Sequence, residues 1–350
     1  MLLNKRILQL SLILISIFIG FIFYEDVNPL LIEQEFSPNL KNWLSKGNYF
    51  YYKDVYKIFY IKEDIAQSSI SGDQNNEQEA TVLFLHGFPT SSYDFSKIWN
   101  QFKLNNENFH LNAKIKSLLT FDYLGYGFSD KPQNYEYSIF DMADMVDKLL
   151  LHLNIQNVFL VAHDISDSVA LEILRRDNLK NQNHFKIEKL VMLNGGIFMN
   201  IYRPVLSQDI LRTKNLNTFF VNNLFKYFLF KNTFPQIFGE FKPPNSTELW
   251  DFYLAIKYKD GNKVLPSTIN YISEREQYGE VWLDALNETS LPVQFIYGPA
   301  DPINPRSKFP QELRSNTPKV KLTILSDIVG HYPQFEDPFT VYELIRNFFL

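Results

Sequence analysis

Short apolar runs alternate with helical segments along most of this chain, and no other feature of the sequence constrains the fold as strongly. Six runs have the length and composition of buried strands: residues 81–85, 117–121, 158–161, 189–193, 293–297 and 320–325. Three other segments are expected to be helices: residues 138–153, 169–176 and 341–349. This alternation predicts an α/β fold with a mostly parallel, doubly wound sheet, whose chemistry lies at the carboxyl ends of the strands.

The alternation stops after Asn194-Gly195-Gly196, and residues 198–284 are helical and aromatic in character. A helical block inserted between two strands of a parallel sheet is typical of a lid over an active site. Alternating aromatic residues at 51–62 predict a hairpin before the first parallel strand. We therefore expect an N-terminal anchor, a core in two parts and a lid, with these bounds: residues 1–30, 31–198 with 285–350, and 199–284.

The N-terminus carries a targeting signal. Lys5 and Arg6 precede an uncharged, mostly apolar stretch at residues 7–24, which as a helix would be about 27 Å long. Neither a short apolar core nor a small-x-small cleavage site is evident, so we predict an uncleaved single-pass transmembrane helix. The positive flank favours a cytoplasmic N-terminus and a lumenal catalytic part. Glycosylation sequons at Asn245 and Asn287 are compatible with that orientation.

Composition excludes several classes of protein. The formal net charge of −5 provides no basic field for nucleic acid. The chain has no cysteine, which removes disulfides, thiol nucleophiles and thiolate metal ligands. Its six histidines include no pair with zinc-site spacing backed by carboxylates. No metal and no cofactor is expected.

The segment at residues 158–168 reads as a strand, a sharp turn and a helix, with Asp164 at the turn. A nucleophile at such an elbow needs small residues two positions to either side, and Ala162 and Ser166 satisfy this. If Ser166 were the nucleophile, Asp164 would occupy one of the crowded small-residue positions. Asp164 is therefore the predicted nucleophile. The alternative for Asp164 is a helix cap.

His86-Gly87-Phe88-Pro89 follows an earlier strand, at the position of a loop that helps to form an oxyanion hole. The expected donors are the backbone amides of Phe88 and Ile165, while the side chain of His86 is expected to brace the loop. Residues 122–132 form another turn with two glycines. No Gly-Lys-Ser/Thr follows, so this turn is interpreted as scaffold rather than as a phosphate loop.

Two further residues complete a catalytic arrangement. Asp301 follows the strand at residues 293–297, where a carboxylate could orient a catalytic histidine. His331 lies between the last strand and the last helix. The order along the chain is nucleophile, acid, histidine. Four motifs in the correct order and strand context support one joint site.

These motifs resemble the mesoderm-specific transcript protein family of the α/β-hydrolases, which is related to epoxide hydrolases and haloalkane dehalogenases. The resemblance covers about residue 80 to the C-terminus and rests on residues 86–94, 122–132, 194–198, 203–204 and 331–338. It implies an α/β-hydrolase fold, and the apolar N-terminus agrees with the location of that family in the endoplasmic-reticulum membrane.

The chain departs from these relatives after the nucleophile, where Ile165 and Ser166 replace an aromatic residue and glycine. Ile165 and Phe88 offer no side-chain donor for a halide ion, which disfavours dehalogenation. Epoxide hydrolases use lid tyrosines to protonate the epoxide oxygen, and Tyr271 is the candidate here, with Tyr253 and Tyr258 as companions.

The resemblance implies a two-step hydrolysis in which Asp164 forms an alkyl ester and His331, oriented by Asp301, activates water. The predicted substrate is a small apolar or lipid-like epoxide. Two alternatives stay open: ester hydrolysis or acyl transfer through Ser166, and a catalytically silent protein that binds a ligand or partner. Arg203 and Arg275 are expected to be exposed on the lid.

Overall fold

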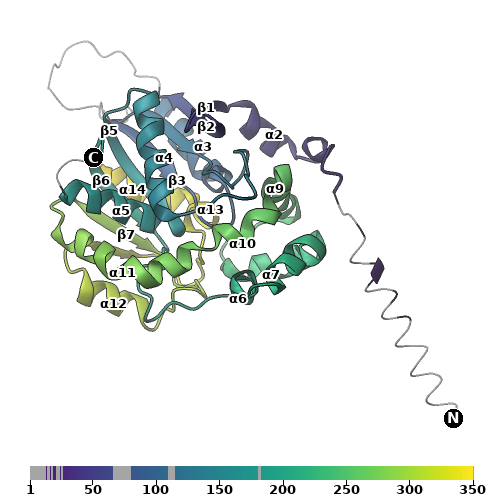
Figure 1. The fold of residues 1–350 in the computed structure, drawn as a ribbon. Coiled ribbons are helices and arrows are strands. Elements are labelled where there is room, and N and C mark those ends of the chain that lie inside the picture. The colour runs from purple at the N-terminus through teal and green to yellow at the C-terminus, as the bar shows by residue number, and fades with distance from the viewer. Residues whose placement is uncertain are drawn as a thin grey trace.

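The structure is a computed structural model that describes residues 13, 16, 19, 20, 24, 27–65, 80–108, 115–179 and 183–349. Within these residues an eight-stranded sheet has the order β1-β2-β4-β3-β5-β6-β7-β8 (Figure 1). The strands are β1 Asn48–Tyr52, β2 Tyr56–Asp64, β3 Ala80–Leu85, β4 Ile115–Phe121, β5 Asn157–His163, β6 Lys186–Leu193, β7 Val293–Tyr297 and β8 Lys321–Ile324. Strands β3 to β8 are mutually parallel, whereas β2 is antiparallel to β1 and β4. The predicted α/β fold with a mostly parallel sheet is confirmed.

Helices cover both faces of the sheet. Those of the core are α3 Ser96–Asn108, α4 Ile139–His152, α5 Ile165–Asn178, α12 Phe309–Asn316, α13 Pro333–Glu336 and α14 Pro338–Phe349. Helices α4 and α5 pack together in front of the sheet in Figure 1, while α3 and α14 pack together behind it. Since the central strands are covered on both sides, β3 is buried at every position, and an alternating polar pattern is absent there.

Aromatic contacts fix the rear layer. Phe84 of β3 packs against Trp99 and Phe102 of α3, with ring centroids 5.9 and 5.6 Å away. Phe159 of β5 stacks on Phe349 of α14 at 4.6 Å. Each fully buried aromatic side chain contributes about 1.5–3 kcal/mol to folding. Helix α3 was not predicted from the sequence, because its polar residues hide the buried stripe that these contacts reveal.

The strand register brings distant loops together. Leu85 at the end of β3 pairs with Ala162 of β5, and His163 of β5 pairs with Leu193 of β6. Leu193 in turn pairs with Ile296 of β7. The segments that follow β3, β5, β6 and β7 therefore emerge at one edge of the sheet.

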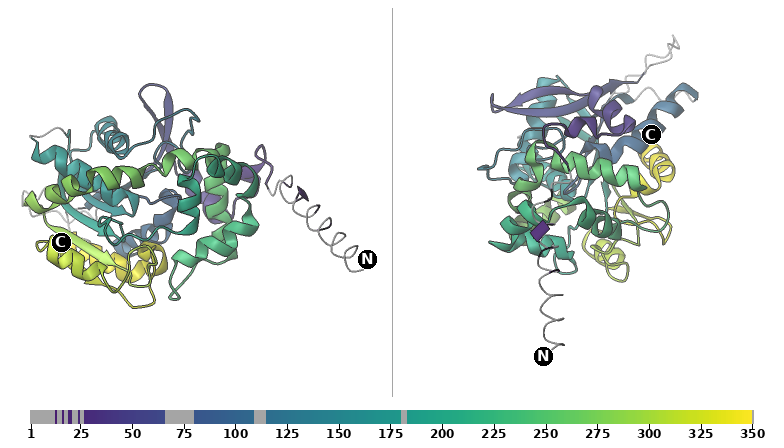
Figure 2. Two further views of the ribbon diagram at one scale, coloured as in Figure 1. Left: turned by 60° about the horizontal axis from the view of Figure 1, so that its bottom comes forward. Right: turned by 90° about the vertical axis from the view of Figure 1, so that its right-hand side faces the viewer.

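Between β6 and β7 the chain forms helices and no strand. These are α6 Leu206–Arg212, α7 Leu216–Phe219, α8 Tyr227–Thr233, α9 Ser246–Lys257, α10 Leu265–Thr268 and α11 Tyr271–Glu288, with short 3₁₀ and π segments among them. Helices α6 to α10 form a group at one side of the sheet in both Figure 1 and Figure 2, whereas α11 runs back along α5.

Residues 27–45 dock against this helical insertion and the core. The hydroxyl of Ser37, which caps α2 (Pro38–Ser45), donates to Asp251 Oδ2 at 2.5 Å, and Tyr258 donates to Glu33 at 2.8 Å. Within the described residues, no helix combines the length and apolar character needed to cross a bilayer. The predicted transmembrane segment at residues 7–24 lies for the most part outside them.

Candidate active site

Asp164 lies at a sharp turn between β5 and α5. Its backbone angles are φ 53° and ψ −109°, a conformation that is strained for a residue with a side chain. As N-cap of α5 it makes no side-chain capping hydrogen bond, so the cap alternative is wrong. Its side chain is instead held elsewhere, and the residue is only 3% exposed. Strain at this position is what a turn that presents a reactive side chain would require.

The two carboxylate oxygens of Asp164 have different surroundings. Oδ2 accepts a hydrogen bond of 3.0 Å from the backbone N–H of Phe88, in the loop after β3. Ile165 is the first residue of α5, and the first amides of a helix have no carbonyl partner within it. Oδ1 lies 4.0 Å from Nε2 of His331. One oxygen thus faces an amide and the other faces an imidazole.

Asp301 and His331 form a buried pair. Nδ1 of His331 lies 2.9 Å from Oδ2 of Asp301, and both residues are almost fully buried. The other carboxylate oxygen of Asp301 accepts from the N–H of Ile303 at 2.8 Å. Because Nδ1 contacts a carboxylate, it carries the proton in the neutral ring, which leaves the lone pair of Nε2 available on the side of Asp164.

Asn194 joins the loops of this pair, although no role was predicted for it from the sequence. It follows β6, and its amide donates to Asp301 Oδ2 and to the carbonyl of Gly298 at 3.0 and 3.1 Å. Its carbonyl oxygen accepts from the N–H of Gly298 at 2.8 Å. Asn304 also donates to Asp301 Oδ2, at 3.0 Å. The carboxylate that orients His331 is therefore itself held by two amides.

Replacing Asn194 with alanine is expected to destabilise the fold by about 3 kcal/mol, since buried donors and acceptors lose their partner. The positive φ of 50° at this position adds strain for alanine. Chemical denaturation with a matched Asn222→Ala control, at an exposed position, would measure the difference. Equal stability of the two variants would contradict the bracing role.

His163, directly before Asp164, holds His331 through the backbone of that residue. Nε2 of His163 lies 2.9 Å from the backbone carbonyl of His331. Burial, reinforced by the neighbouring His331, lowers the pKa of His163 well below its ordinary value. The ring is therefore neutral, and Nε2 is the donor, because a carbonyl can only accept.

The scaffold predictions for the neighbouring loops agree with the contacts. Nε2 of His86 accepts from the N–H of Tyr123, so its side chain supports the loop rather than the reaction. Asp122 accepts from the N–H of Ser92 and of Phe128 at 2.7 and 2.6 Å. These bonds connect the turn at residues 122–132 to the segment that follows the Phe88 loop.

Ser166 is not arranged as a nucleophile. Its hydroxyl donates to the carbonyl of His86 at 2.6 Å and lies 3.0 Å from the hydroxyl of Tyr123. The side chain is fully buried, and its contacts are with scaffold residues. The structure therefore disfavours the alternative in which Ser166 carries an acyl group.

Tyr271 lies at the start of α11, beside the oxyanion loop. Its ring centroid is 5.4 Å from that of Phe88, and its hydroxyl accepts from Gln208 at 3.1 Å. Gln208 also accepts from the hydroxyl of Tyr202 at 2.9 Å. Burial, together with nearby Tyr202 and Asp164, raises the pKa of Tyr271 well above its ordinary value. The hydroxyl therefore keeps its proton.

The structure does not bring the expected companions to the hydroxyl of Tyr271. Tyr253 donates to the carbonyl of Phe225, and Tyr258 donates to Glu33. Tyr202 is connected to Tyr271 through Gln208 instead. The sequence did not indicate this neighbour, because Tyr202 lies much earlier in the chain than the tyrosines considered there.

Arg275 is buried, contrary to the expectation of a surface residue. It is 2% exposed, and its Nη2 donates to the backbone carbonyl of Asp164 at 2.7 Å. Arg203 is exposed as expected. The sequence did not indicate the burial of Arg275, because the pattern of a helix shows which residues share a face but not which element covers that face.

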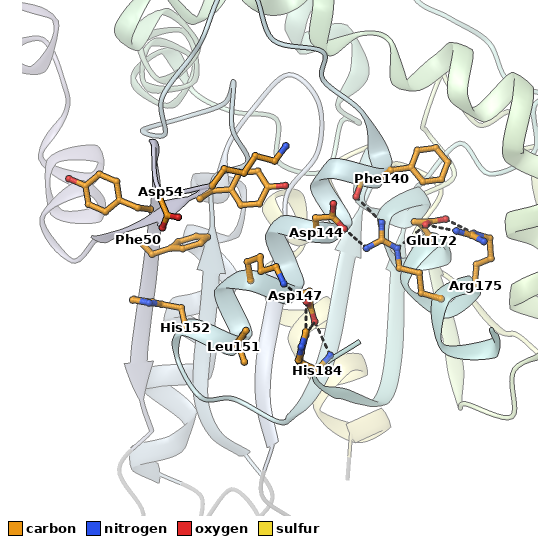
Figure 3. Close-up of a pocket in the computed structure, with 15 residues that line it drawn as sticks. Phe50, Asp54, Phe140, Asp144, Asp147, Leu151, His152, Glu172, Arg175 and His184 are labelled. Carbon is orange, nitrogen blue, oxygen red and sulfur yellow. Dashed lines mark hydrogen bonds and ion pairs between the residues drawn. The ribbon is translucent and has the colours of Figure 1, made fainter. Parts of the chain in front are cut away.

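Among the residues that the structure describes, no group of three or more histidine or acidic side chains has an arrangement that could hold a metal ion. A groove of about 880 Å³ lies on the outer surface and is lined by residues of β1, α4 and α5 (Figure 3). Its charged side chains pair with one another: His184 with Asp147, Arg175 with Glu172, and Arg176 with Asp144. None of the candidate catalytic residues lines it.

Comparisons with known proteins agree with this geometry. Residues 80–165 match the family model of the alpha/beta hydrolase fold. The mesoderm-specific transcript protein of Mus musculus is 39% identical over 306 residues, which cover 87% of this chain and 86% of the mouse protein. The chain belongs to the mesoderm-specific transcript protein family. That family is the one the sequence motifs resemble, and the resemblance is confirmed.

Solved structures of α/β-hydrolases with different activities have the same fold as this chain. The Cif epoxide hydrolase from Acinetobacter nosocomialis superposes with a TM-score of 0.69 at 15% identity, over 93% of this chain and 98% of that one. The haloalkane dehalogenase DatA from Agrobacterium tumefaciens C58 gives 0.65 at 18% identity, over 87% and 96%. At these identities the likeness is one of fold.

Proposed function

We propose that this chain hydrolyses epoxides of small apolar or lipid-like molecules through a covalent ester on Asp164. The strongest support for the proposal is that the two oxygens of the Asp164 carboxylate have different neighbours. Oδ2 of Asp164 accepts from the Phe88 amide, while Oδ1 faces Nε2 of His331 at 4.0 Å. A carboxylate that only stabilised the fold would not need a strained backbone, or a histidine paired with a second carboxylate beside its Oδ1.

In the first step Oδ1 of Asp164 attacks an epoxide carbon, and the carbon–oxygen bond of the ring breaks. The new alkoxide takes a proton from the hydroxyl of Tyr271, which later recovers one from solvent. Gln208 and Tyr202 orient that hydroxyl. The product of this step is a hydroxyalkyl ester of Asp164.

In the second step His331 removes a proton from water, and the resulting hydroxide attacks Cγ of the ester. Negative charge develops on Oδ2, where the amide of Phe88 already donates and the amide of Ile165 is next along the chain. The bond between Cγ and Oδ1 then breaks, and the departing alkoxide takes the proton from His331. A diol leaves with Oδ1, and Asp164 retains the oxygen of the water. The remaining proton of that water passes from the new carboxyl group to solvent, which restores the carboxylate. Neither step calls for a metal or a cofactor.

The substrate class follows from the groups beside Asp164. Phe88 and Ile165 offer no side-chain donor that could hold a halide ion, whereas Tyr271 offers a hydroxyl to an oxygen. The neighbouring side chains of the insertion are largely aromatic and apolar. A panel of epoxides, alkyl halides and acyl esters tests the proposal directly. Hydrolysis of epoxides alone is expected, and turnover of only acyl esters would overturn it.

The base-catalysed step is expected to accelerate with rising pH. Burial favours the neutral ring of His331, but the charge and hydrogen bond of Asp301, aided by Asp164, outweigh it and raise the pKa to about 9. Below that pH the ring is protonated and cannot accept a proton. Esterification neutralises Asp164, so the pKa of His331 falls in the intermediate.

We therefore expect ester hydrolysis, followed in single-turnover experiments, to rise about tenfold per pH unit at acidic pH and to level off below pH 9. Asp301→Asn should move the plateau to lower pH, because it removes the strongest charge that raises the pKa of His331. A rate of ester hydrolysis that stays constant from acidic to alkaline pH would contradict His331 as the base.

We also propose that residues 7–24 anchor the chain in the endoplasmic-reticulum membrane, with the catalytic part in the lumen. The length of this apolar run and the flanking Lys5 and Arg6 support it. Asn245, an exposed sequon residue at the start of α9, would then be open to glycosylation. A glycosidase-sensitive mass shift lost in Asn245→Gln is expected. Release of the protein by alkaline carbonate would overturn the anchor.

A further inference from the structure

A buried arginine from the helical insertion meets the nucleophile. Arg275 lies one helical turn after Tyr271 on α11, so both side chains project from the same face. Its guanidinium carbon lies 4.8 Å from the centre of the Tyr271 ring. The residue is 2% exposed, although burial of a guanidinium is costly unless it is paired.

Three contacts connect Arg275 to the elbow. Nη2 donates to the backbone carbonyl of Asp164 at 2.7 Å and lies 3.7 Å from its Oδ1. Nε donates to the hydroxyl of Ser168 in the first turn of α5, at 2.8 Å. The arginine thus binds both the strained residue and the helix that follows it.

The chain after β6 leaves room for this arginine. A Cβ atom on Gly196 would lie 3.1 Å from Nη1 of Arg275 and 2.8 Å from the ring of Tyr202. Nη1 itself is buried and has no hydrogen-bond partner. Within the described residues, the carboxylate of Asp164 is the only one in ion-pair range of Arg275. Asp167 also interacts electrostatically with Arg275, from beyond that range. The nearest counter-charge of the arginine is therefore the Asp164 carboxylate.

The other groups around Asp164 cannot provide the same charge. Those that interact with it electrostatically are His86, Tyr126, Asp167, Tyr202, Tyr271, Arg275, His331 and Tyr332. Burial raises the pKa of the tyrosines and lowers the pKa of His86, so these groups are uncharged near neutral pH. Burial also raises the pKa of Asp167, against the opposing charge of Arg275, and an aspartate carries no positive charge in either form. The positively charged neighbours are Arg275 and His331, and only Arg275 keeps its charge while the histidine exchanges protons.

We propose that Arg275 is a positioning residue that pairs with the Asp164 carboxylate at the elbow and keeps its Oδ1 toward His331. This inference rests on the proposed function only in calling Asp164 a nucleophile; the ion pair can be tested without turnover. It makes the insertion part of the catalytic machinery, because the cation comes from α11 and the carboxylate from the β5–α5 elbow. The alkylation step would then require α11 to be docked.

Arg275→Gln keeps an amide donor but removes the charge, and Arg275→Lys restores a charge. Arg212→Gln is the matched control, because Arg212 is another arginine of the insertion, paired at the surface with Glu276. The carboxyl carbon of Asp164 can be followed by NMR in protein with isotope-labelled aspartate. Its signal is assigned by its loss in Asp164→Asn, and thermal unfolding reports whether each variant is folded.

We expect the carboxyl carbon signal of Asp164, measured at neutral pH, to move in Arg275→Gln, because the carboxylate loses an opposite charge 3.7 Å away. The signal should return toward wild type in Arg275→Lys. Arg212→Gln should leave it unchanged. If Arg275→Gln does not fold, the lysine variant and the wild type are compared at low and high salt, where a buried pair should resist screening.

An unmoved signal in Arg275→Gln, or an equal change in Arg212→Gln, would overturn the inference. So would a wild-type signal that moves with salt as strongly as that of an exposed aspartate. None of these readouts depends on catalysis. If the signal moves as expected but no ester ever forms on Asp164, the proposed function fails while the ion pair stands.

Discussion

Asp164→Ala is expected to abolish epoxide hydrolysis, with a loss of at least about ten-thousand-fold in turnover. Without the carboxylate no covalent ester can form, and the remaining groups could only assist a direct attack by water. His331 and the Phe88 amide would still be present, so a small residual rate is expected. Turnover numbers measured with purified protein and a reactive epoxide would give the ratio.

Isotope labelling identifies the attacking atom. Under single-turnover conditions in heavy-oxygen water, the oxygen of the incoming water should end on Asp164 rather than on the diol. Mass spectrometry of the peptide that contains residues 158–168 would detect it. Label in the diol alone would mean that water attacks the substrate directly, and the covalent scheme would be wrong.

Ser166→Ala is the matched control for the rival nucleophile. Ser166 lies two residues after Asp164 on the same helical turn, but its hydroxyl binds the carbonyl of His86. We expect this variant to keep turnover within about tenfold of wild type, and a serine-reactive fluorophosphonate to leave the wild-type protein unlabelled. Loss of all activity together with labelling of Ser166 would instead favour the esterase alternative.

The core was predictable from the sequence because its signals are local. The strand at residues 293–297 has the predicted bounds, and the strand after residue 320 differs by one residue at each end. Strands buried on both faces produce unbroken apolar runs, and the loops after them meet at one edge whatever the loops contain. That is why the amino-acid sequence was sufficient to expect Phe88, Asp164, Asp301 and His331 close together.

The helical insertion was less predictable because its contacts depend on how separate helices pack. Arg275 and Tyr202 lie far apart in the sequence, yet both approach Asp164, and neither has a motif around it. Asn194 has a motif, but its role depends on the register that brings β6 beside β7. A periodic pattern tells which residues share a face of one helix, not which element will cover that face.

His331→Gln is expected to stop the reaction at the covalent ester. Alkylation uses Oδ1 of Asp164 and does not require a base, so the first step should proceed. Hydrolysis of the ester should slow by about a thousand-fold or more, because no group would remain to deprotonate the attacking water. Intact-protein mass spectrometry after incubation with the epoxide should show a mass increase equal to one substrate molecule, and the modified peptide should contain Asp164.

A variant of a second histidine, His184, is the control for the effect of His331→Gln. His184→Gln, in the surface groove where His184 pairs with Asp147, should turn over like wild type and accumulate no ester. Asp301→Asn should accumulate less ester than His331→Gln, because His331 would keep its place through the contact of His163 with its backbone but lose the carboxylate that fixes its tautomer. A His331→Gln protein that neither turns over nor gains mass would mean that His331 is needed for the first step. The assignment of alkylation to Asp164 alone and of ester hydrolysis to His331 would then be wrong.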